Sequence, residues 1–148
     1  MSKKRVVVGS DEPYPIAKFV VEYLKSKGFE VILVGAVKTG KSVPWPIVGY
    51  EVGEKVSKGE AETGIVICYT GTGVSIAANK VKGVRAALVF DSYTARAARL
   101  WNDANVLALS ARLTSEEIAK EIINEWFSVE QPDPTELENI EKLKSLDR

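Results

Sequence analysis

The segment ICYTGTGVS, residues 67–75, joins the only cysteine of the chain to a glycine-rich turn. It continues the β-forming run 64–67, so a helix that starts after the turn would present free backbone N–H groups beside Cys68. Such groups bind anions, stabilise a developing oxyanion and favour a thiolate over a thiol. A base beside an oxyanion site is suited to removing a proton from a carbon next to a carbonyl. The segment therefore makes Cys68 a candidate catalytic base.

The same residues also allow plainer interpretations. A free cysteine at the end of a buried strand most often behaves as a small hydrophobic side chain, and two glycines alone establish only a tight turn. Gly71 and Gly73 lack the third glycine of a dinucleotide-binding fingerprint and do not follow the first strand. The segment also lacks the Gly-Lys-Ser/Thr end of a nucleoside-triphosphate loop. Without further comparison, these residues indicate a small-molecule-binding α/β domain.

Short β-branched runs alternate with segments of helical periodicity along most of the chain. The predicted strands are residues 5–9, 30–34, 64–68, 84–90 and 105–109. The predicted helices are residues 16–27, 73–80, 92–103 and 114–127. Thr114 is expected to cap the last helix, with Glu117 completing a capping box, and 38–46 is expected to be a loop. The alternation predicts an α/β fold, a three-layer Rossmann-like domain with a five-stranded parallel sheet and helices on both faces.

A proline-flanked break at 132–134 ends this alternation. We expect residues 1–131 to form the α/β domain and residues 132–148 to form a C-terminal helical tail. The helix of this tail, residues 135–146, is acidic in its first half and basic in its second, and it is expected to pack outside the core or at a subunit interface.

The composition limits the classes of partner that we expect. In 148 residues, 20 Lys and Arg residues balance 20 Asp and Glu residues, so no net charge attracts nucleic acid or an anionic membrane over long range. No apolar run approaches the roughly 20 residues that span a bilayer, and residues 1–4 lead straight into a predicted strand. One cysteine cannot form an internal disulfide. We therefore expect a cytoplasmic protein that binds a small molecule or another protein chain.

Ligands of an open parallel sheet bind beyond the carboxyl ends of its strands. This rule brings together four segments that each follow a predicted strand: 9–12, 68–75, 90–91 and 110–112. The candidate site is expected at this edge of the sheet.

Two longer segments extend the interpretation: GIVICYTGTGVSIAANKVKGVRAAL, residues 64–88, and WNDANVLALSAR, residues 101–112. They resemble the ribose-5-phosphate isomerase B and galactose-6-phosphate isomerase family, in which Cys-Gly-Thr-Gly-x-Gly precedes a Ser-Ile-Ala-Ala-Asn-Lys stretch. The resemblance begins at Gly9-Ser10-Asp11 and extends to the end of the predicted helix 114–127. It implies aldose–ketose isomerisation through an enediolate without metal or cofactor. It also implies a homodimer or a dimer of dimers, with active sites at the subunit interface.

The resemblance assigns roles to individual residues. Cys68 matches the thiolate base, and Thr70 matches a hydroxyl near the ring oxygen of the sugar. Asp11 and Asn102 match residues that hold substrate hydroxyls, and Arg112 matches a phosphate-binding arginine. The other expected substrate-binding residues are Tyr69, Gly71, Thr72, Gly73, Val74, Ser75 and Trp101.

The departures from the family pattern concern ring opening and phosphate binding. The chain has no histidine: Glu12 follows Asp11 where the family has histidine, and Trp101 occupies the position of the ring-opening histidine. A tryptophan N–H can donate a hydrogen bond but cannot transfer a proton back and forth. The arginine-containing tail motif of the family is replaced by 130–134, which has no arginine. Glu12 is therefore a third candidate catalytic residue, as an acid–base group or as an acceptor of sugar hydroxyls.

These departures predict a sugar substrate other than ribose 5-phosphate: unphosphorylated, differently charged, or open-chain. Trp45 and Trp101 either offer flat apolar faces to a sugar or belong to the core or an interface. Glu12 either acts in the site or favours the start of the first helix through its charge. A non-catalytic sugar-binding or partner subunit of a hetero-oligomeric isomerase is the alternative function, although the retained Cys68 favours an enzyme.

Overall fold

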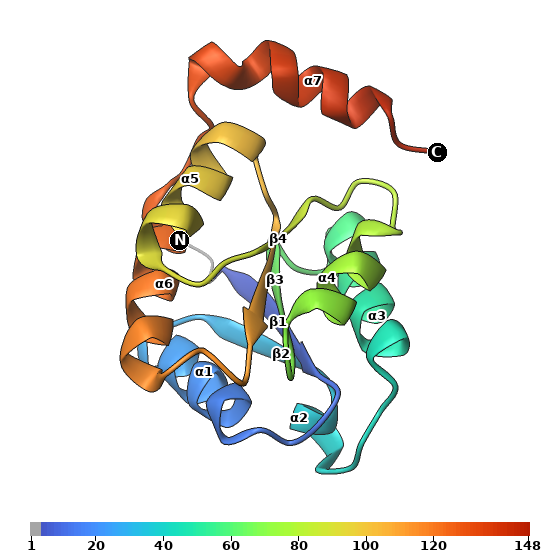
Figure 1. The fold of residues 1–148 in the computed structure, drawn as a ribbon, viewed down its shortest axis with the longest axis vertical. Helices are drawn as coiled ribbons and strands as arrows, with labels where there is room; N and C mark the ends of the chain where they lie inside the picture. Colours follow the sequence, from blue (N-terminus) through green and yellow to red (C-terminus); the bar gives the residue numbers. More distant parts are fainter. Residues whose placement is uncertain (1–3) are drawn as a thin grey trace.

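Five parallel strands form the central layer of the protein, in the order β2-β1-β3-β5-β4 (Figure 1). The structure, a computed structural model, describes residues 4–148. Its strands are β1 (Arg5–Ser10), β2 (Glu30–Gly35), β3 (Thr63–Cys68), β4 (Ala86–Leu88) and β5 (Val106–Ser110). The central strand β3 is buried along its whole length, which is typical of an apolar run covered on both faces. The predicted five-stranded parallel sheet is confirmed.

Helices cover both faces of this sheet, as the alternation predicted. One face carries α1 (Pro15–Ser26), α5 (Ser92–Asn102) and α6 (Glu116–Ser128) (Figure 1). The other face carries α3 (Trp45–Ser57) and α4 (Thr72–Asn79), and the short α2 (Ala36–Thr39) follows the carboxyl end of β2. Two separate apolar clusters fill the spaces between the layers. Within residues 4–148, no helix combines the length and the apolar character that crossing a bilayer would need.

Helix α3 was not predicted, and it begins inside the segment expected to be a loop. Residues 38–46 contain the end of α2 and the start of α3. Pro46 does not prevent the helix, because it lies in the first turn of α3, where a proline is tolerated. The helix packs closely on the sheet at two glycines. A Cβ atom on Gly9 would lie 2.7 Å from Val52, and one on Gly64 would lie 2.6 Å from the same side chain. The loop prediction was therefore wrong at both ends of the segment.

The start of α6 also differs from the prediction. Ser115 caps the helix, and its hydroxyl accepts a hydrogen bond from the N–H of Ile118 at 3.2 Å. Thr114 is buried one residue earlier, so the predicted capping box with Glu117 does not form.

Strand β4 begins later than the predicted 84–90, because side-chain amides form hydrogen bonds with the backbone at residues 85 and 86. Asn79 accepts the N–H of Ala86 at 2.8 Å and donates to its carbonyl at 3.0 Å. Asn105 accepts the N–H of Arg85 at 2.7 Å. The Asn79 contacts occupy the backbone of Ala86 on the outer edge of the sheet, which limits pairing with another strand there.

The C-terminal tail lies across the amino edge of the sheet, where Figure 1 shows α7 (Leu137–Ser145) after the short 3-10 turn η1 (Pro134–Glu136). Ile140 anchors the helix and is 2 % exposed. The N–H of Asp133 donates to the carbonyl of Leu100 at 2.8 Å, and the carboxylate of Asp147 accepts the N–H of Gly83 at 3.0 Å. The tail thus packs on the α5 and β4 side of its own chain.

We predict that Gly64→Ala lowers the free energy of unfolding by about 1–3 kcal/mol, because the new methyl group overlaps Val52. Urea denaturation with an unchanged m-value would measure this loss. Val52→Ala supplies the control: it creates a cavity alone but makes room for the methyl group, so the double variant should lose less than the sum of the single losses. Strictly additive losses would contradict the close contact.

Candidate active site

The carboxyl edge of the sheet opens where the chain reverses its winding direction. Strands β1 and β3 are neighbours, but β1 leads into α1 on one face and β3 leads into α4 on the other. The two connections diverge, and ligands of such folds bind in the crevice between them. Residues 10–14 and 68–71 flank this crevice. The structure therefore brings these two predicted segments together.

Cys68 is the last residue of β3, and its side chain is 5 % exposed. The N–H of Gly71 donates a hydrogen bond to Cys68 Sγ at 3.2 Å. The turn that allows this contact places Gly71 at a φ of 81°, the left-handed conformation that favours glycine. Helix α4 begins at the next residue, so the thiol lies at the positive end of the helix dipole. The sulfur therefore lies beside a backbone hydrogen-bond donor and the amino end of a helix.

The first turn of α4 holds the residues that were expected to form an anion cradle. Within residues 4–148, the N–H group of Gly73 has no hydrogen-bond acceptor, so it is available to an oxygen anion. Val74 is 0 % exposed, so this expected substrate-binding residue presents neither its side chain nor its N–H to the site. The N–H of Ser75 donates to the carbonyl of Gly71 at 3.3 Å, so the group that Ser75 can offer to a substrate is its side-chain hydroxyl.

Two threonine hydroxyls stand at the rim of this cradle. Thr70 and Thr72 share a hydrogen bond of 2.7 Å between their hydroxyl oxygens, and the N–H of Thr72 also donates to Thr70 Oγ1 at 3.4 Å. The pairing fixes the Thr70 hydroxyl at the amino end of α4, where a substrate oxygen could exchange a hydrogen bond with it.

The loop after β5 borders the Cys68 turn. The N–H of Ala111 donates to the carbonyl of Cys68, and the N–H of Arg112 donates to the carbonyl of Tyr69, both at 2.9 Å. The side chains of Arg112 and Tyr69 are exposed beside this contact. A guanidinium in this position adds a positive charge to the β3 and β5 side of the crevice.

Carboxylates line the β1 side of the crevice. Asp11 Oδ1 is buried and has no hydrogen-bond partner in the described part of the chain, residues 4–148. Burial raises the pKa of the Tyr14 hydroxyl, and its interaction with Asp11 raises that pKa further. Tyr14, which the sequence did not single out, therefore stays protonated and can donate a hydrogen bond. Glu12 is exposed, and its Oε2 accepts a hydrogen bond from the Ser42 hydroxyl at 2.5 Å.

Trp45, at the start of α3, lies against the cradle. A Cβ atom on Gly73 would lie 2.8 Å from Cε3, 2.9 Å from Cδ2 and 3.3 Å from Cε2 of its indole. Since Cε3 and Cε2 lie on either side of Cδ2, these similar distances place Gly73 over the face of the ring. The side chain is 46 % exposed, so it borders the site without joining the core. Its only sequence signal was a tryptophan between two prolines.

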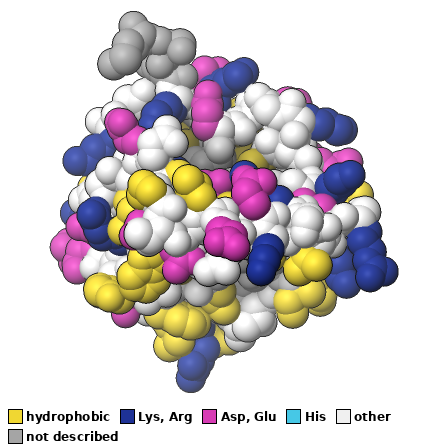
Figure 2. Space-filling model, turned by 90° about the horizontal axis from the view of Figure 1, so that it is seen from above, with side chains coloured by type: hydrophobic (Ala, Val, Ile, Leu, Met, Phe, Trp, Pro, Cys, Tyr) yellow, Lys and Arg dark blue, Asp and Glu magenta, His cyan; other side chains and the backbone are white. Residues whose placement is uncertain are grey.

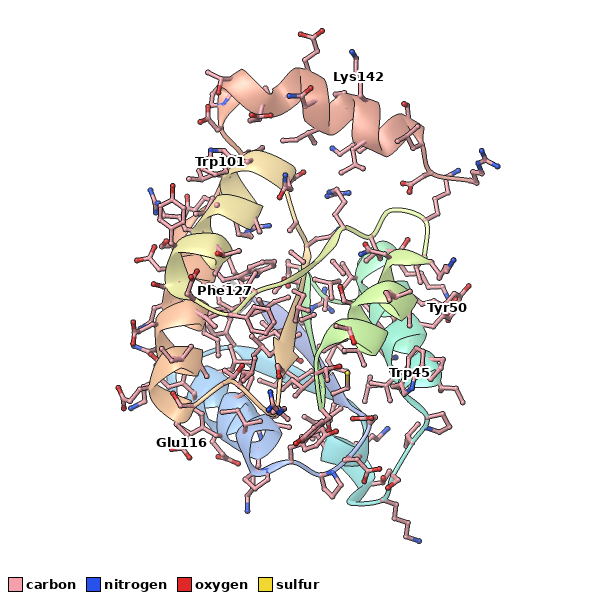
Figure 3. The ribbon with its side chains drawn as sticks, viewed as in Figure 1. Trp45, Tyr50, Trp101, Glu116, Phe127 and Lys142 are labelled. Atoms are coloured by element: carbon pink, nitrogen blue, oxygen red, sulfur yellow. The ribbon has the colours of Figure 1, made fainter. Side chains whose placement is uncertain are left out.

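Trp101 and Asn102 do not lie near Cys68 of the same chain. Both residues end α5 at the amino edge of the sheet, and β3 separates the two edges by about 16 Å. Figure 3 shows Trp101 near α7 and Trp45 toward the opposite end of the molecule. Asn102 instead borders a cavity of about 400 Å³ that α7 covers. One chain therefore does not assemble every expected site residue.

The arginines near α5 serve the fold. Arg85 pairs with Asp103 at 3.3 Å, and Arg96 pairs with Glu125 at 3.6 Å. Arg99 donates hydrogen bonds to two backbone carbonyls. In the part of the chain that the structure describes, no group of three or more Cys, Asp and Glu side chains could hold a metal ion.

Residues 6–143 match the Ribose/Galactose Isomerase family. The chain belongs to this family. Galactose-6-phosphate isomerase subunit LacB of Clostridium acetobutylicum is 42 % identical over 143 residues, which cover 96 % of this chain and 81 % of that protein. D-erythrulose-4-phosphate isomerase of Pectobacterium atrosepticum is 36 % identical over 139 residues, which cover 93 % and 91 %. A solved structure of ribose-5-phosphate isomerase B from Clostridium thermocellum is 40 % identical, with a TM-score of 0.89 over 96 % of each chain.

Membership of the ribose/galactose isomerase family confirms the resemblance that residues 64–88 and 101–112 indicated. The Rossmann-like fold is confirmed by the same comparison with solved structures. The chain is thus an aldose–ketose isomerase, and its relatives differ from one another in the sugar that they are named for.

We predict that Gly71→Ala lowers the free energy of unfolding by about 2 kcal/mol or more. The change places a side chain at a positive φ, and its Cβ atom would lie 2.5 Å from Leu88 and 3.0 Å from the Leu109 backbone. Gly28→Ala is the matched control, because Gly28 has a φ of 91° but open space around it. Urea denaturation should show a larger loss for Gly71→Ala, and equal losses would contradict the close packing of this turn.

Proposed function

We propose that this isomerase acts on a sugar that reaches the site in open-chain form, with Cys68 as the base. The observation that carries the proposal is the buried thiol that accepts the Gly71 N–H at the amino end of α4, in a chain without histidine. A four-carbon sugar phosphate is the substrate that these features favour.

The chemistry follows from the groups around the thiol. A Cys68 thiolate takes the proton from the carbon next to the carbonyl, and the electrons of that bond form an enediolate. The N–H group of Gly73, which has no acceptor within residues 4–148, stabilises its negative oxygen together with the amino end of α4. The Cys68 thiol then returns the proton to the neighbouring carbon, while a proton moves between the two oxygens. The products are the isomeric sugar and the original thiolate.

The groups on the β1 side argue against ring opening. Opening a sugar ring needs one group that donates a proton and one that accepts a proton. The raised pKa of Tyr14 keeps its hydroxyl protonated, and the indole N–H of Trp101, from either chain, can donate a hydrogen bond but cannot transfer a proton. Aldoses of four carbons with a phosphate on the last oxygen cannot close a five-membered ring. One relative is named for such a substrate, D-erythrulose 4-phosphate, and Arg112 offers a cation for the phosphate.

A second copy of the chain would complete the site with Trp101 and Asn102. Tyr93 and Trp101 form an edge-to-face pair on α5 and are 72 % and 44 % exposed. Exposed neighbouring aromatic side chains of this kind favour a subunit interface. On the face shown in Figure 2, acidic and basic side chains are intermixed and hydrophobic side chains gather toward one margin. We therefore favour a homodimer or a dimer of dimers with shared active sites.

A partner subunit is the second candidate, because one relative is itself named as a subunit of galactose-6-phosphate isomerase. In that case this chain would need a dissimilar chain for activity. Purification of the chain expressed alone, followed by an activity assay, separates this candidate from the homodimer.

We predict that the wild-type protein catalyses deuterium uptake from deuterated water into D-erythrose 4-phosphate, and that Cys68→Ala slows this uptake by about 100-fold or more. The labelled position, next to the carbonyl, would be read by NMR. Val66→Ala is the matched control, since it removes buried atoms from the same apolar cluster without touching the thiol.

Two outcomes would contradict the proposal. Undiminished uptake with Cys68→Ala would remove the thiol as base. A higher kcat/KM for D-ribose 5-phosphate than for D-erythrose 4-phosphate would remove the open-chain preference.

We also predict that a hybrid dimer of Cys68→Ala and Asn102→Ala chains has about half of the wild-type activity, because one of its two sites holds both native residues. The two chains would be co-expressed with different tags and purified over both. Each variant alone should be inactive. A hybrid as inactive as its parents would show that Asn102 does not act across an interface.

A further inference from the structure

The segment that leads from α2 into the first residue of α3 contacts the residues around the crevice at three points. The N–H of Val43 donates to the Asp11 carbonyl at 2.9 Å, and the hydroxyl of Ser42 donates to Glu12 Oε2 at 2.5 Å. The third point is the indole of Trp45 over Gly73. These contacts join segments more than 25 residues apart, so the position of Trp45 depends on the loop after β1 as well as on α3.

The indole ring narrows the space beside the anion cradle. Gly73 supplies one of the free N–H groups of α4, and the ring face lies directly over its Cα. A ring in this position leaves less room for substrate atoms beyond those that reach the cradle. Its exposed part offers a flat apolar surface to the carbon chain of a sugar.

The Glu12 carboxylate faces the loop that carries this ring. An oxygen that already accepts the Ser42 hydroxyl is less available as an acid or base for a substrate. The same hydrogen bond holds the segment that leads through Pro44 into Trp45. The geometry thus gives Glu12 a structural connection to the indole that its place in the sequence did not show.

We propose that Trp45 determines the length of sugar that the site accepts, and that Glu12 is a positioning residue that holds Trp45 in place through Ser42. This inference rests on the proposed function, because it assigns a substrate limit to the same crevice. The ring is in contact with Gly73 and forms a wall beside the cradle, so a short open-chain sugar lies along its exposed part, whereas a longer or cyclic sugar meets the ring.

The first test compares kcat/KM for D-erythrose 4-phosphate and D-ribose 5-phosphate in the wild type, Trp45→Phe and Trp45→Ala. We expect the preference for the four-carbon sugar to fall by about 10-fold in Trp45→Ala, the usual effect of room for one more carbon group in a pocket. Trp45→Phe keeps a flat ring and should retain most of the preference. An unchanged preference in Trp45→Ala would overturn the inference, whereas a wild type without activity on any sugar would overturn the proposed function instead.

The second test examines Glu12 with Glu12→Gln, Glu12→Ala and Ser42→Ala. The amide oxygen of Glu12→Gln can still accept the Ser42 hydroxyl, so this variant should keep more of the four-carbon preference than Glu12→Ala. Glu12→Ala and Ser42→Ala should lower the preference by similar factors, and the double variant should lower it no further. Glu22→Gln, an exposed carboxylate change on α1, is the control for altered charge.

Two readouts distinguish positioning from acid–base catalysis. In a Trp101→Phe background, Trp126 is buried, so acrylamide quenching of fluorescence reports Trp45, and Glu12→Ala should increase it. The pH profile of kcat/KM should keep its shape in Glu12→Gln. Loss of one limb of that profile, with unchanged quenching in Glu12→Ala, would make Glu12 an acid–base group and overturn the positioning role.

Discussion

The hydrogen bond from the Gly71 N–H to Cys68 Sγ depends on a turn that only glycine adopts readily. The turn reverses the chain between β3 and α4 within three residues, so the thiol and the helix amino end share one crevice. Its close packing against Leu109 ties it to the neighbouring strand. The thiol and the amino end of α4 therefore form one unit, whose geometry is set by backbone conformation more than by side-chain choice.

Buried parallel strands could be predicted well because each is a continuous apolar run. The segment 64–68 differs from β3 by one residue. Helix α3 could not be predicted in this way, since Gly49 and Gly53 lower helix propensity and weaken the pattern. The structure shows why they are needed: a Cβ atom on Gly49 would lie 2.7 Å from Ala77 of α4. The glycines that allow α3 to pack closely on α4 thus weaken the sequence pattern that would have predicted α3.

The candidate site also contains a part that the sequence could predict and a part that it could not. Cys68 and its cradle could be found because a single contiguous segment holds the strand end, the turn and the helix start. The contact of Trp45 with Gly73 joins distant segments, and no periodicity marks it. Asn102 could be recognised by resemblance, but its place at the other edge of the sheet follows only from the direction of α5. Local patterns therefore predicted the strand end, the turn and the helix start around Cys68, while the contacts between distant segments required the fold.

Charge in the crevice is separated between its two sides, and this reconciles a phosphorylated substrate with nearby carboxylates. The β3 and β5 side holds the amino end of α4 and Arg112, both favourable to an anion. The β1 side holds Asp11, whose buried Oδ1 has no hydrogen-bond partner among residues 4–148 and is suited to accept a sugar hydroxyl. Because Glu12 is turned toward Ser42, its charge is directed to the loop and away from the cradle. The proposed function uses this separation: it places the developing negative oxygen at α4 and the sugar hydroxyls at β1, without a histidine on either side.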